Sequence, residues 1–303
     1  MSFEVTILGS SAAIPTVERN TTSQYINCHQ RHVLIDCGEA TQHQLRRFKI
    51  KFQQINIILI SHLHGDHVFG LPGLISTMQL LGRNTLLKIF GPKGIKKLLL
   101  TQLTEVGLKE FFPIEIIELE AQSSGTIFED KCIEISFFPL KHRITAHGYL
   151  IKEKPHKRRL IREDFDKTGV SVSYIQRLIQ GENITDLEGK TVKSDDVTIP
   201  GKQTKSYAFC SDTAYHESIV DHIKQVDLLY HEATFLDREA TRAAETYHST
   251  AKQAATIAFK ANAKRLILGH FSARYRNLNE FKIEAETIFS PVFIPADGEH
   301  FII

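Results

Sequence analysis

Residues 61–67 read Ser-His-Leu-His-Gly-Asp-His, and they follow directly after an apolar run from Asn56 to Ile60. The run is short and rich in isoleucine, which predicts a buried β-strand. Three imidazoles and a carboxylate within six residues are too dense for a hydrophobic core, because buried ionisable side chains are costly unless they are paired or bind a metal. The stretch therefore predicts a metal site at the end of a strand.

The spacing within this stretch indicates two neighbouring ions. In an extended segment residues two apart point the same way, so His62 and His64 can share one metal ion. Gly65 lets the chain turn, and Asp66 and His67 can then reach a second ion beside the first. Nitrogen and carboxylate ligands without a thiolate suit zinc, or alternatively iron or manganese.

The rest of the chain mixes strand-like and helical patterns, which favours layered α/β packing. Pro92 can open one helix at its first turn, and Ser249 can cap another that runs from Thr250 to Ala261. The expected strands, besides the run before residue 61, are Phe3 to Leu8, Gln24 to Cys28, His32 to Ile35, Leu86 to Phe90, Ile133 to Phe138, Ser206 to Cys210, Val226 to Tyr230 and Arg265 to Leu268.

The bulk composition sets wider limits. The 303 residues are 42% hydrophobic and carry a formal net charge of +2, so a large core is expected, and a nucleic-acid partner is neither required nor excluded. The four cysteines lie far apart without a C-x-x-C pair, and we expect thiols rather than disulfides. No run is long and apolar enough to span a bilayer, and no secretory leader is evident, so we expect a cytoplasmic protein without membrane contact.

The motif H-x-H-x-D-H after a strand resembles the signature of the metallo-β-lactamase superfamily. The resemblance implies an α/β fold in which one domain over 1–303 forms a four-layer αβ/βα sandwich, with the metals at one edge between two sheets. The superfamily's remaining ligands each follow a later strand, and His142, Asp212 and His270 stand in those positions.

That resemblance implies a complete set of ligands for two zinc ions (Zn2+) per subunit. The first ion would be held by His62, His64 and His142, and the second by Asp66, His67 and His270. Asp212 would bridge both. Asp36 matches an early aspartate of the superfamily that orients a ligand histidine through a hydrogen bond, although a simple turn residue at a strand end is the alternative.

Several further stretches resemble the ribonuclease Z family in particular, and the resemblance extends over nearly the whole chain, at least from Ile7 to His270. Pro15 with Arg19-Asn20 resembles the family's P-x-K-x-R-N loop, but Val17 stands where lysine is expected. The other stretches are 69–74 (Phe-Gly-Leu-Pro-Gly-Leu), 231–235 (His-Glu-Ala-Thr-Phe), 247–251 (Tyr-His-Ser-Thr-Ala) and 270–275 (His-Phe-Ser-Ala-Arg-Tyr).

For this family the implied activity is removal of the 3′ trailer from precursor tRNA, leaving a 3′-hydroxyl on the tRNA and a 5′-phosphate on the trailer. Such a cleavage needs a nucleophile, neutralisation of phosphoryl charge and a proton for the departing 3′ oxygen. Asp66 is implied as ligand and proton acceptor, and His248, oriented by Glu232, as the acid. Arg274 would help to neutralise the phosphoryl charge.

The segment 152–205 is polar, with few strand-like runs and a short helical pattern around Tyr174 to Ile179. A solvated loop is one interpretation. The resemblance implies instead the family's inserted flexible arm, a tRNA-binding exosite that contacts phosphates by shape. The family's arm usually contains Gly-Pro, whereas here Val170 follows Gly169. The basic residues expected to contact tRNA are Lys154, Lys157, Arg158, Arg159 and Arg162.

Two other functions remain open at this point. A hydrolase of small esters or phosphodiesters could use the same metal ligands. The arm and the loops at Glu232 and His248 speak against it, and a trailer-cleavage assay would separate the two functions. A non-catalytic RNA-binding scaffold would be expected to lack some ligands, and none is missing. The family resemblance also implies a homodimer, the commonest closed assembly.

Overall fold

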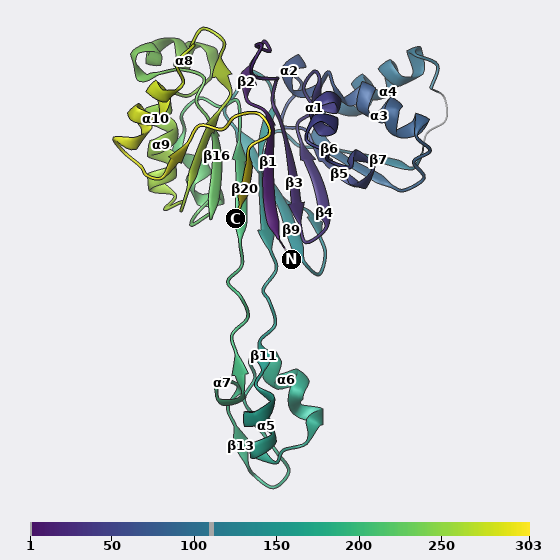
Figure 1. Cartoon of the computed structure of the whole chain (residues 1–303), viewed down its shortest axis with the longest axis vertical. Helices are drawn as coiled ribbons and strands as arrows, with labels where there is room; N and C mark the ends of the chain where they lie inside the picture. The colour runs from purple at the N-terminus through teal and green to yellow at the C-terminus, as the bar shows by residue number, and fades with distance from the viewer. Residues whose placement is uncertain (1, 109–111) are drawn as a thin grey trace. The chain divides into compact units, whose positions relative to one another are not determined.

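Two seven-stranded sheets lie at the centre of the larger part of the fold (Figure 1). The computed structural model describes residues 2–108 and 112–303. In order across the first sheet, the strands are β20 (His300–Ile302), β1 (Phe3–Gly9), β3 (Ser23–Cys28), β4 (Arg31–Ile35), β5 (Ile57–Leu59), β6 (Leu87–Pro92) and β7 (Ile114–Leu119). The second sheet contains β19 (Val292–Phe293), β17 (Leu266–Gly269), β16 (Leu228–Glu232), β15 (Ser206–Cys210), β10 (Ala146–Glu153), β9 (Ile133–Leu140) and β8 (Gly125–Glu129). Each sequence-predicted strand corresponds to one of these strands.

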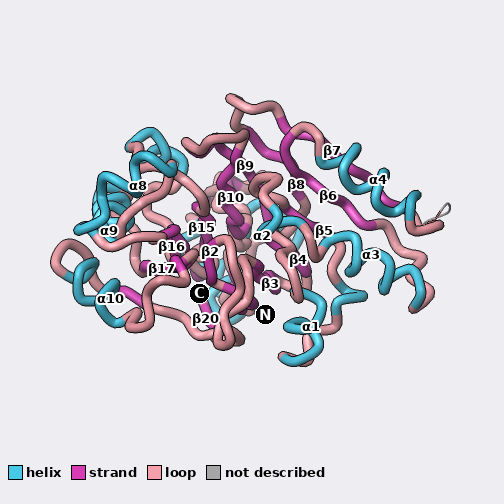
Figure 2. Tube along the Cα trace, turned by 90° about the horizontal axis from the view of Figure 1, so that it is seen from above, coloured by secondary structure: helices cyan, strands magenta, loops and turns pink. Residues whose placement is uncertain are grey.

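Helices cover the outer faces of both sheets, as Figure 2 shows from above. Buried side chains of α1 (Thr41–Arg47), α3 (Leu71–Leu80) and α4 (Ile95–Glu105) join one core cluster with strands of the first sheet. Those of α9 (Ala251–Lys260) and α10 (Asn279–Glu286) do the same on the second sheet. The shorter helices of this part are α2 (Gly65–Val68), α8 (Ala240–Thr246), η1 (Phe52–Gln54), η3 (Glu217–His222) and η4 (Asp237–Glu239). The four-layer αβ/βα architecture predicted from the sequence is confirmed.

The core between the two sheets contains large side chains that water does not reach. Val5 and Ile26 of the first sheet and Tyr149, Tyr207 and Tyr230 of the second are all fully buried and belong to one cluster. Burying a large apolar side chain stabilises the fold by about 1.5–3 kcal/mol, and close packing makes the region rigid. A rigid double sheet fixes the loops at its edge, which is where the metal motif lies.

Parallel pairing brings the functional loops to one edge. Strands β4 and β5 are parallel neighbours in the first sheet, and β15, β16 and β17 are parallel neighbours in the second. Because parallel strands end on the same side of a sheet, the residues that follow them gather there. A short parallel pair, β2 (Ser11–Ala12) with β18 (Phe271–Ser272), joins the N-terminal loop to the segment after β17 at this edge.

Two expected helix starts are wrong. Pro92 ends strand β6, and α4 begins only at Ile95 after Gly94, whose φ of 105° is a backbone conformation open mainly to glycine. Helix α9 is capped by Thr250 rather than by Ser249. Thr250 and Gln253 form a reciprocal capping box, whereas the hydroxyl of Ser249 donates to the backbone carbonyl of Thr213 (2.6 Å).

The segment Glu153–Thr204 forms a second compact unit, separate from the unit that comprises Met1–Lys152 and Lys205–Ile303. It has a hydrophobic core of its own, so it is not a structureless loop. Gly169 ends its first helix with a φ of 71°, and the Val170 side chain is buried in the core. The elements of this unit are β11 (Arg159–Leu160), α5 (Arg162–Thr168), η2 (Val172–Tyr174), α6 (Ile175–Ile179), β12 (Ile184–Thr185), β13 (Thr191–Val192), α7 (Ser194–Val197) and β14 (Thr198–Ile199).

Two negative findings apply to the described chain. None of the helices in residues 2–108 and 112–303 is long and apolar enough to cross a membrane. The four cysteines, all within those ranges, form no disulfide, as expected from their spacing.

Candidate metal centre

The candidate ligands follow strand ends, and three of the residues at these ends turn sharply. Asp36 after β4, Asp212 after β15 and His270 after β17 have φ values of 57°, 49° and 58°. Left-handed backbone is uncommon for residues other than glycine, and such residues concentrate at functional sites, where the surrounding structure holds them in place.

One group of ligand atoms joins both sheets. Nε2 of His62 lies 3.0 Å from Nδ1 of His64 and 3.4 Å from Oδ2 of Asp212. Nε2 of His142 lies 3.3 Å from the same His64 nitrogen and 3.8 Å from the same Asp212 oxygen. Four potential ligands of a metal ion therefore converge on one point.

A second group lies beside the first and shares Asp212. Nε2 of His270 is 3.1 Å from Oδ1 of Asp212, 3.4 Å from Oδ2 of Asp66 and 3.4 Å from Nε2 of His67. Nε2 of His67 lies 3.2 Å from Oδ1 of Asp212 and 3.5 Å from Oδ2 of Asp66. The two oxygens of Asp212 thus face different groups.

Both groups fit tetrahedral zinc. A tetrahedron with metal–nitrogen bonds of about 2.0–2.1 Å has its ligand atoms about 3.3 Å apart. The separations in the two groups run from 3.0 to 3.8 Å. Hydrogen bonds between the rings do not account for this arrangement, because several nitrogens face one another across the same small space. The seven residues that the sequence analysis assigned as ligands are the ones that the structure brings together here.

The outer ring nitrogens of three ligand histidines have acceptors, which fixes the orientation of these three rings. Nδ1 of His67 lies 2.7 Å from Oδ2 of Asp36, and Nδ1 of His142 lies 3.0 Å from the carbonyl oxygen of Tyr247. Nδ1 of His62 lies 3.0 Å from the hydroxyl of Ser61, which itself donates to Asp36. With these protons on Nδ1, the Nε2 lone pairs point into the two groups. Asp36 therefore lies where an orienting aspartate was expected.

Burial keeps two of these rings neutral and ready to bind a metal. It lowers the pKa of His64 and of His142 to about 4. Burial also opposes ionisation of Asp66, but the nearby His67 and a hydrogen bond with His270 hold the pKa of that carboxyl well below its usual range. The backbone N–H of Ala13 donates to Oδ2 of Asp66 (2.8 Å) and fixes the carboxylate further.

A buried carboxylate holds His248 beside the second group. Oε1 of Glu232 lies 2.8 Å from Nδ1 of His248, and Glu232 is fully buried. Burial opposes the charged form of the imidazole, but the negative charge and hydrogen bond of Glu232 raise the pKa of His248 to about 9. His248 is therefore held as a proton donor at neutral pH, while its other nitrogen remains for a ligand in the pocket.

Thr234 links this pair to the metal ligands, a connection that the sequence analysis missed. Its hydroxyl donates to Oε2 of Glu232 (2.7 Å) and lies 2.9 Å from Nδ1 of His270. Since the hydroxyl has one proton, which Glu232 accepts, its oxygen accepts the Nδ1 proton of His270. In the sequence, the stretch 231–235 (His-Glu-Ala-Thr-Phe) indicates a role for Glu232 only. Nothing local shows that its threonine lies between two histidines from other segments.

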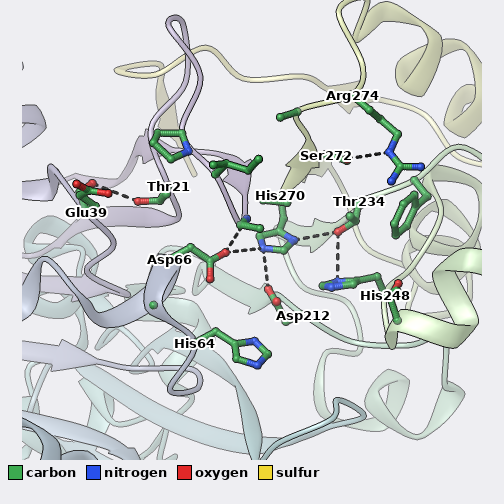
Figure 3. A pocket seen from close by; sticks show the side chains of 18 of the residues that line it. Thr21, Glu39, His64, Asp66, Asp212, Thr234, His248, His270, Ser272 and Arg274 are labelled. Atoms are coloured by element: carbon green, nitrogen blue, oxygen red, sulfur yellow. Dashed lines mark hydrogen bonds and ion pairs between the residues drawn. The ribbon is translucent and has the colours of Figure 1, made fainter.

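The two metal groups open into a cavity of about 800 Å³. His248 and Arg274 line it together with Asp66 and Asp212, as Figure 3 shows. Arg274 lies over the ring of Phe235, 5.1 Å from its centroid, and its Nε donates to the hydroxyl of Ser272 (3.1 Å). The site can therefore hold metal ions, an anionic substrate and a proton donor around one open space.

The residues expected to contact tRNA from the arm do not all have free side chains. Arg158 is held inside the arm, where its Nε donates to the hydroxyl of Thr198 (2.6 Å) and its guanidinium pairs with Asp195. Arg162 pairs with Asp166 one helical turn later (2.9 Å). Lys157 and Arg159 are exposed, and Lys154 is half-buried.

The N-terminal loop departs from the family's P-x-K-x-R-N pattern in the charge that it presents. Val17, in the position of the expected lysine, is fully exposed and supplies no charge. Arg19 has a structural role, since one of its nitrogens donates to the carbonyl oxygen of Pro295 (2.5 Å) and to the hydroxyl of Ser10 (2.7 Å).

Comparison with known proteins agrees with this geometry. Residues 196–271, which hold Asp212 and His270, match a family model described as a β-lactamase superfamily domain. Residues 3–158, which hold the motif at 62–67, match the model of the anti-Pycsar protein Apyc1. A ribonuclease Z from Parabacteroides distasonis is 45% identical over 296 residues, which are 98% of this chain and 97% of that protein. The chain belongs to the ribonuclease Z family. It is therefore a hydrolytic ribonuclease with the metallo-β-lactamase fold, a fold that binds divalent metal.

Other ribonuclease Z proteins and solved structures support the assignment. The ribonuclease Z of Cytophaga hutchinsonii is 43% identical over 305 residues, covering 100% of this chain and 97% of that protein. The crystal structure of human tRNase Z, short form, aligns with a TM-score of 0.70 at 26% identity, with 98% of each chain covered. A long form RNase Z from yeast aligns with a TM-score of 0.72 at 19% identity, covering 99% of this chain and 42% of that one, and shows the shared fold.

Proposed function

We propose that this protein is a two-zinc endoribonuclease that removes the 3′ trailer from precursor tRNA, leaving a 3′-hydroxyl on the tRNA and a 5′-phosphate on the trailer. Its full-length similarity to ribonuclease Z proteins supports the substrate. The observation that carries the chemistry is the pairing of His248 with buried Glu232 at 2.8 Å, beside the two ligand groups. A poor leaving group such as a sugar oxygen needs a proton, and this pair supplies one.

The metal groups define what a bound cofactor would do. His62, His64 and His142 would hold one ion, Asp66, His67 and His270 the other, and Asp212 both. Divalent ions bound there supply a nucleophile by lowering the pKa of water, and they offset negative charge on phosphoryl oxygens. The choice of zinc follows from the nitrogen-rich donor set and its tetrahedral separations.

The remaining roles belong to side chains around these groups. His248 would donate the proton on Nε2 to the departing 3′ oxygen, while Glu232 keeps Nδ1 protonated and the ring in place. Asp66, fixed by the N–H of Ala13, would accept a proton as the nucleophile forms. Arg274 would bind a phosphoryl oxygen from the cavity wall.

The arm is proposed as a separate contact with the folded body of tRNA. Its compact part, residues 153–204, has ten Lys and Arg against nine Asp and Glu, so the total charge of that part is small. Five of the ten lie between residues 154 and 162, and Lys157 and Arg159 among them are exposed. A locally basic strip suits phosphates of a folded RNA better than it suits a base sequence. We also propose that the protein forms a homodimer and that it is located in the cytoplasm.

Cleavage of a 5′-labelled precursor tRNA transcript by the zinc-loaded protein tests this function. We expect a single cut after the unpaired nucleotide that follows the acceptor stem, with the end groups named above. Protein with Asp212→Ala is the matched negative control, because the change removes the shared ligand. A wild-type protein that hydrolyses bis(p-nitrophenyl) phosphate but leaves the transcript intact would instead be a small-phosphodiester hydrolase.

A further inference from the structure

Two arginine side chains in the catalytic cavity have no hydrogen-bond or ion-pair partner among residues 2–108 and 112–303. Arg143 and Arg242 both line the cavity of about 800 Å³ that contains Asp66, Asp212 and His248. Both side chains are exposed, and within residues 2–108 and 112–303 neither makes a hydrogen bond or ion pair. The third arginine of the cavity, Arg274, differs because its guanidinium already contacts Ser272, Glu239 and Phe235.

Guanidinium groups without a protein partner at a substrate site indicate which charges the substrate carries. Arginine presents a planar fork of donors that matches phosphate oxygens, and its charge does not titrate in the physiological range. Metal ions held by the two ligand groups would offset the charge of the scissile phosphate. Two further cations in the same cavity therefore indicate additional anions of the substrate, and a chain of phosphodiesters provides them at regular spacing.

Both arginines belong to the segments that hold His248. Arg143 directly follows the ligand His142, whose Nδ1 donates to the carbonyl oxygen of Tyr247 (3.0 Å). Arg242 lies on α8, and Tyr247 ends that helix immediately before His248. The rings of His142 and His248 lie 5.2 Å apart, centroid to centroid, so the segment that contains Arg143 adjoins His248. The arginines thus lie on the side of the cavity from which the proton is donated.

We propose that Arg143 and Arg242 form a subsite for the RNA backbone on the 5′ side of the cut, binding phosphates of the strand that leaves with a 3′-hydroxyl. This inference rests on the proposed function, in which His248 protonates the oxygen of that strand. The trailer strand, which keeps the scissile phosphate, would then lie away from these two arginines. The subsite reads backbone charge and geometry, so it favours no base sequence.

Steady-state cleavage of precursor tRNA by Arg143→Ala, Arg242→Ala and the double variant tests the subsite. Each single change should raise KM about tenfold. For the double variant, the slope of log affinity against log salt should become shallower by about 1.4–1.8, because each lost phosphate contact releases about 0.7–0.9 counterion fewer. The loss on bis(p-nitrophenyl) phosphate, which has one phosphate, should stay below about threefold. Arg276→Ala is the matched control, since Arg276 is exposed and lines the neighbouring cavity instead.

A competition experiment determines on which side of the cut the two arginines bind the RNA, and it does not depend on tRNA cleavage. Two short RNAs, one ending in a 3′-hydroxyl and one beginning with a 5′-phosphate, are tested as inhibitors of bis(p-nitrophenyl) phosphate hydrolysis. We expect the double variant to weaken inhibition by the first RNA at least tenfold and inhibition by the second less than threefold. Equal weakening, or an unchanged KM and salt slope for precursor tRNA, would overturn the proposal. If the wild-type protein cleaves no tRNA, the proposed function fails, whereas the inhibition difference still reports on the subsite.

Discussion

Replacing His248 separates proton donation from the rest of the chemistry. The His248→Ala change leaves all seven candidate ligands in place. Glu232 keeps three hydrogen bonds, from the N–H of Thr213 (2.8 Å), the N–H of Thr234 (3.0 Å) and the Thr234 hydroxyl (2.7 Å). The buried carboxylate loses its charge partner, which destabilises the fold, so His248→Gln is made in parallel. Its amide can still donate to Glu232 but has no acidic proton.

The size of the effect follows from the leaving group. General acid catalysis contributes about a hundredfold to ten-thousandfold, which corresponds to about 2.7–5.4 kcal/mol of barrier. We expect a loss of that size in single-turnover cleavage of precursor tRNA by both variants, measured at neutral pH with zinc. The p-nitrophenolate ion leaves without a proton, so hydrolysis of bis(p-nitrophenyl) phosphate should fall by less than about fivefold. His43→Ala, a change at an exposed histidine outside the cavity, should alter neither rate.

The comparison between substrates is what decides this role. Equal losses on the tRNA and on the activated ester, in variants that still bind two metal ions per chain, would show that His248 supports the site in another way. The proton would then have to come from a different group, and Glu232 would have only a structural function.

Four further outcomes are expected. Asp66→Ala should abolish turnover of both substrates, since it removes a ligand and the proton acceptor together; measurable ester hydrolysis would contradict both roles. Thr234→Val should weaken metal binding about tenfold to a hundredfold in a chelator competition, because His270 loses its hydrogen-bond acceptor (2.9 Å), and unchanged binding would count against that link. Replacing residues 154–203 with a short Gly/Ser linker should raise KM for precursor tRNA about tenfold or more and flatten its salt dependence, yet preserve ester hydrolysis; retained tRNA affinity would refute the exosite. The protein should sediment as a dimer at micromolar concentration, and a monomer with full tRNA cleavage would refute the dimer proposal.

The sequence predicted strands where apolar runs reflect burial on both faces. The run from Asn56 to Ile60 is of this kind, because β5 lies inside the first sheet between β4 and β6. Five strands of the two sheets were missed, namely β7, β8, β10, β19 and β20. Of these, β7 (Ile114–Leu119) is the edge strand of its sheet and largely half-buried or exposed, so its glutamates interrupt the apolar pattern. The start of α4 was misplaced for a local reason, since the turn at Gly94 and not Pro92 sets where the helix begins.

The candidate site was predictable where its chemistry is concentrated in sequence. The motif at 62–67 contains four of the seven ligands, and the other three follow apolar strands. What supports these ligands was not predictable, because it depends on contacts between distant segments. The acceptor for His142 is a backbone carbonyl of residue 247, which no side-chain pattern records. The position of Thr234 between Glu232 and His270 likewise depends on parallel pairing of β16 with β17.

In the proposed centre, one carboxylate, Asp212, joins two ions at a single catalytic site. A crystal of the zinc-loaded protein, measured on both sides of the zinc absorption edge, tests it directly. We expect two anomalous peaks about 3.5–4 Å apart, with Asp212 in contact with both ions. The first ion should also contact His62, His64 and His142, and the second Asp66, His67 and His270. A single fully occupied peak in zinc-replete protein, or an Asp212 side chain turned away from the metal, would contradict the account.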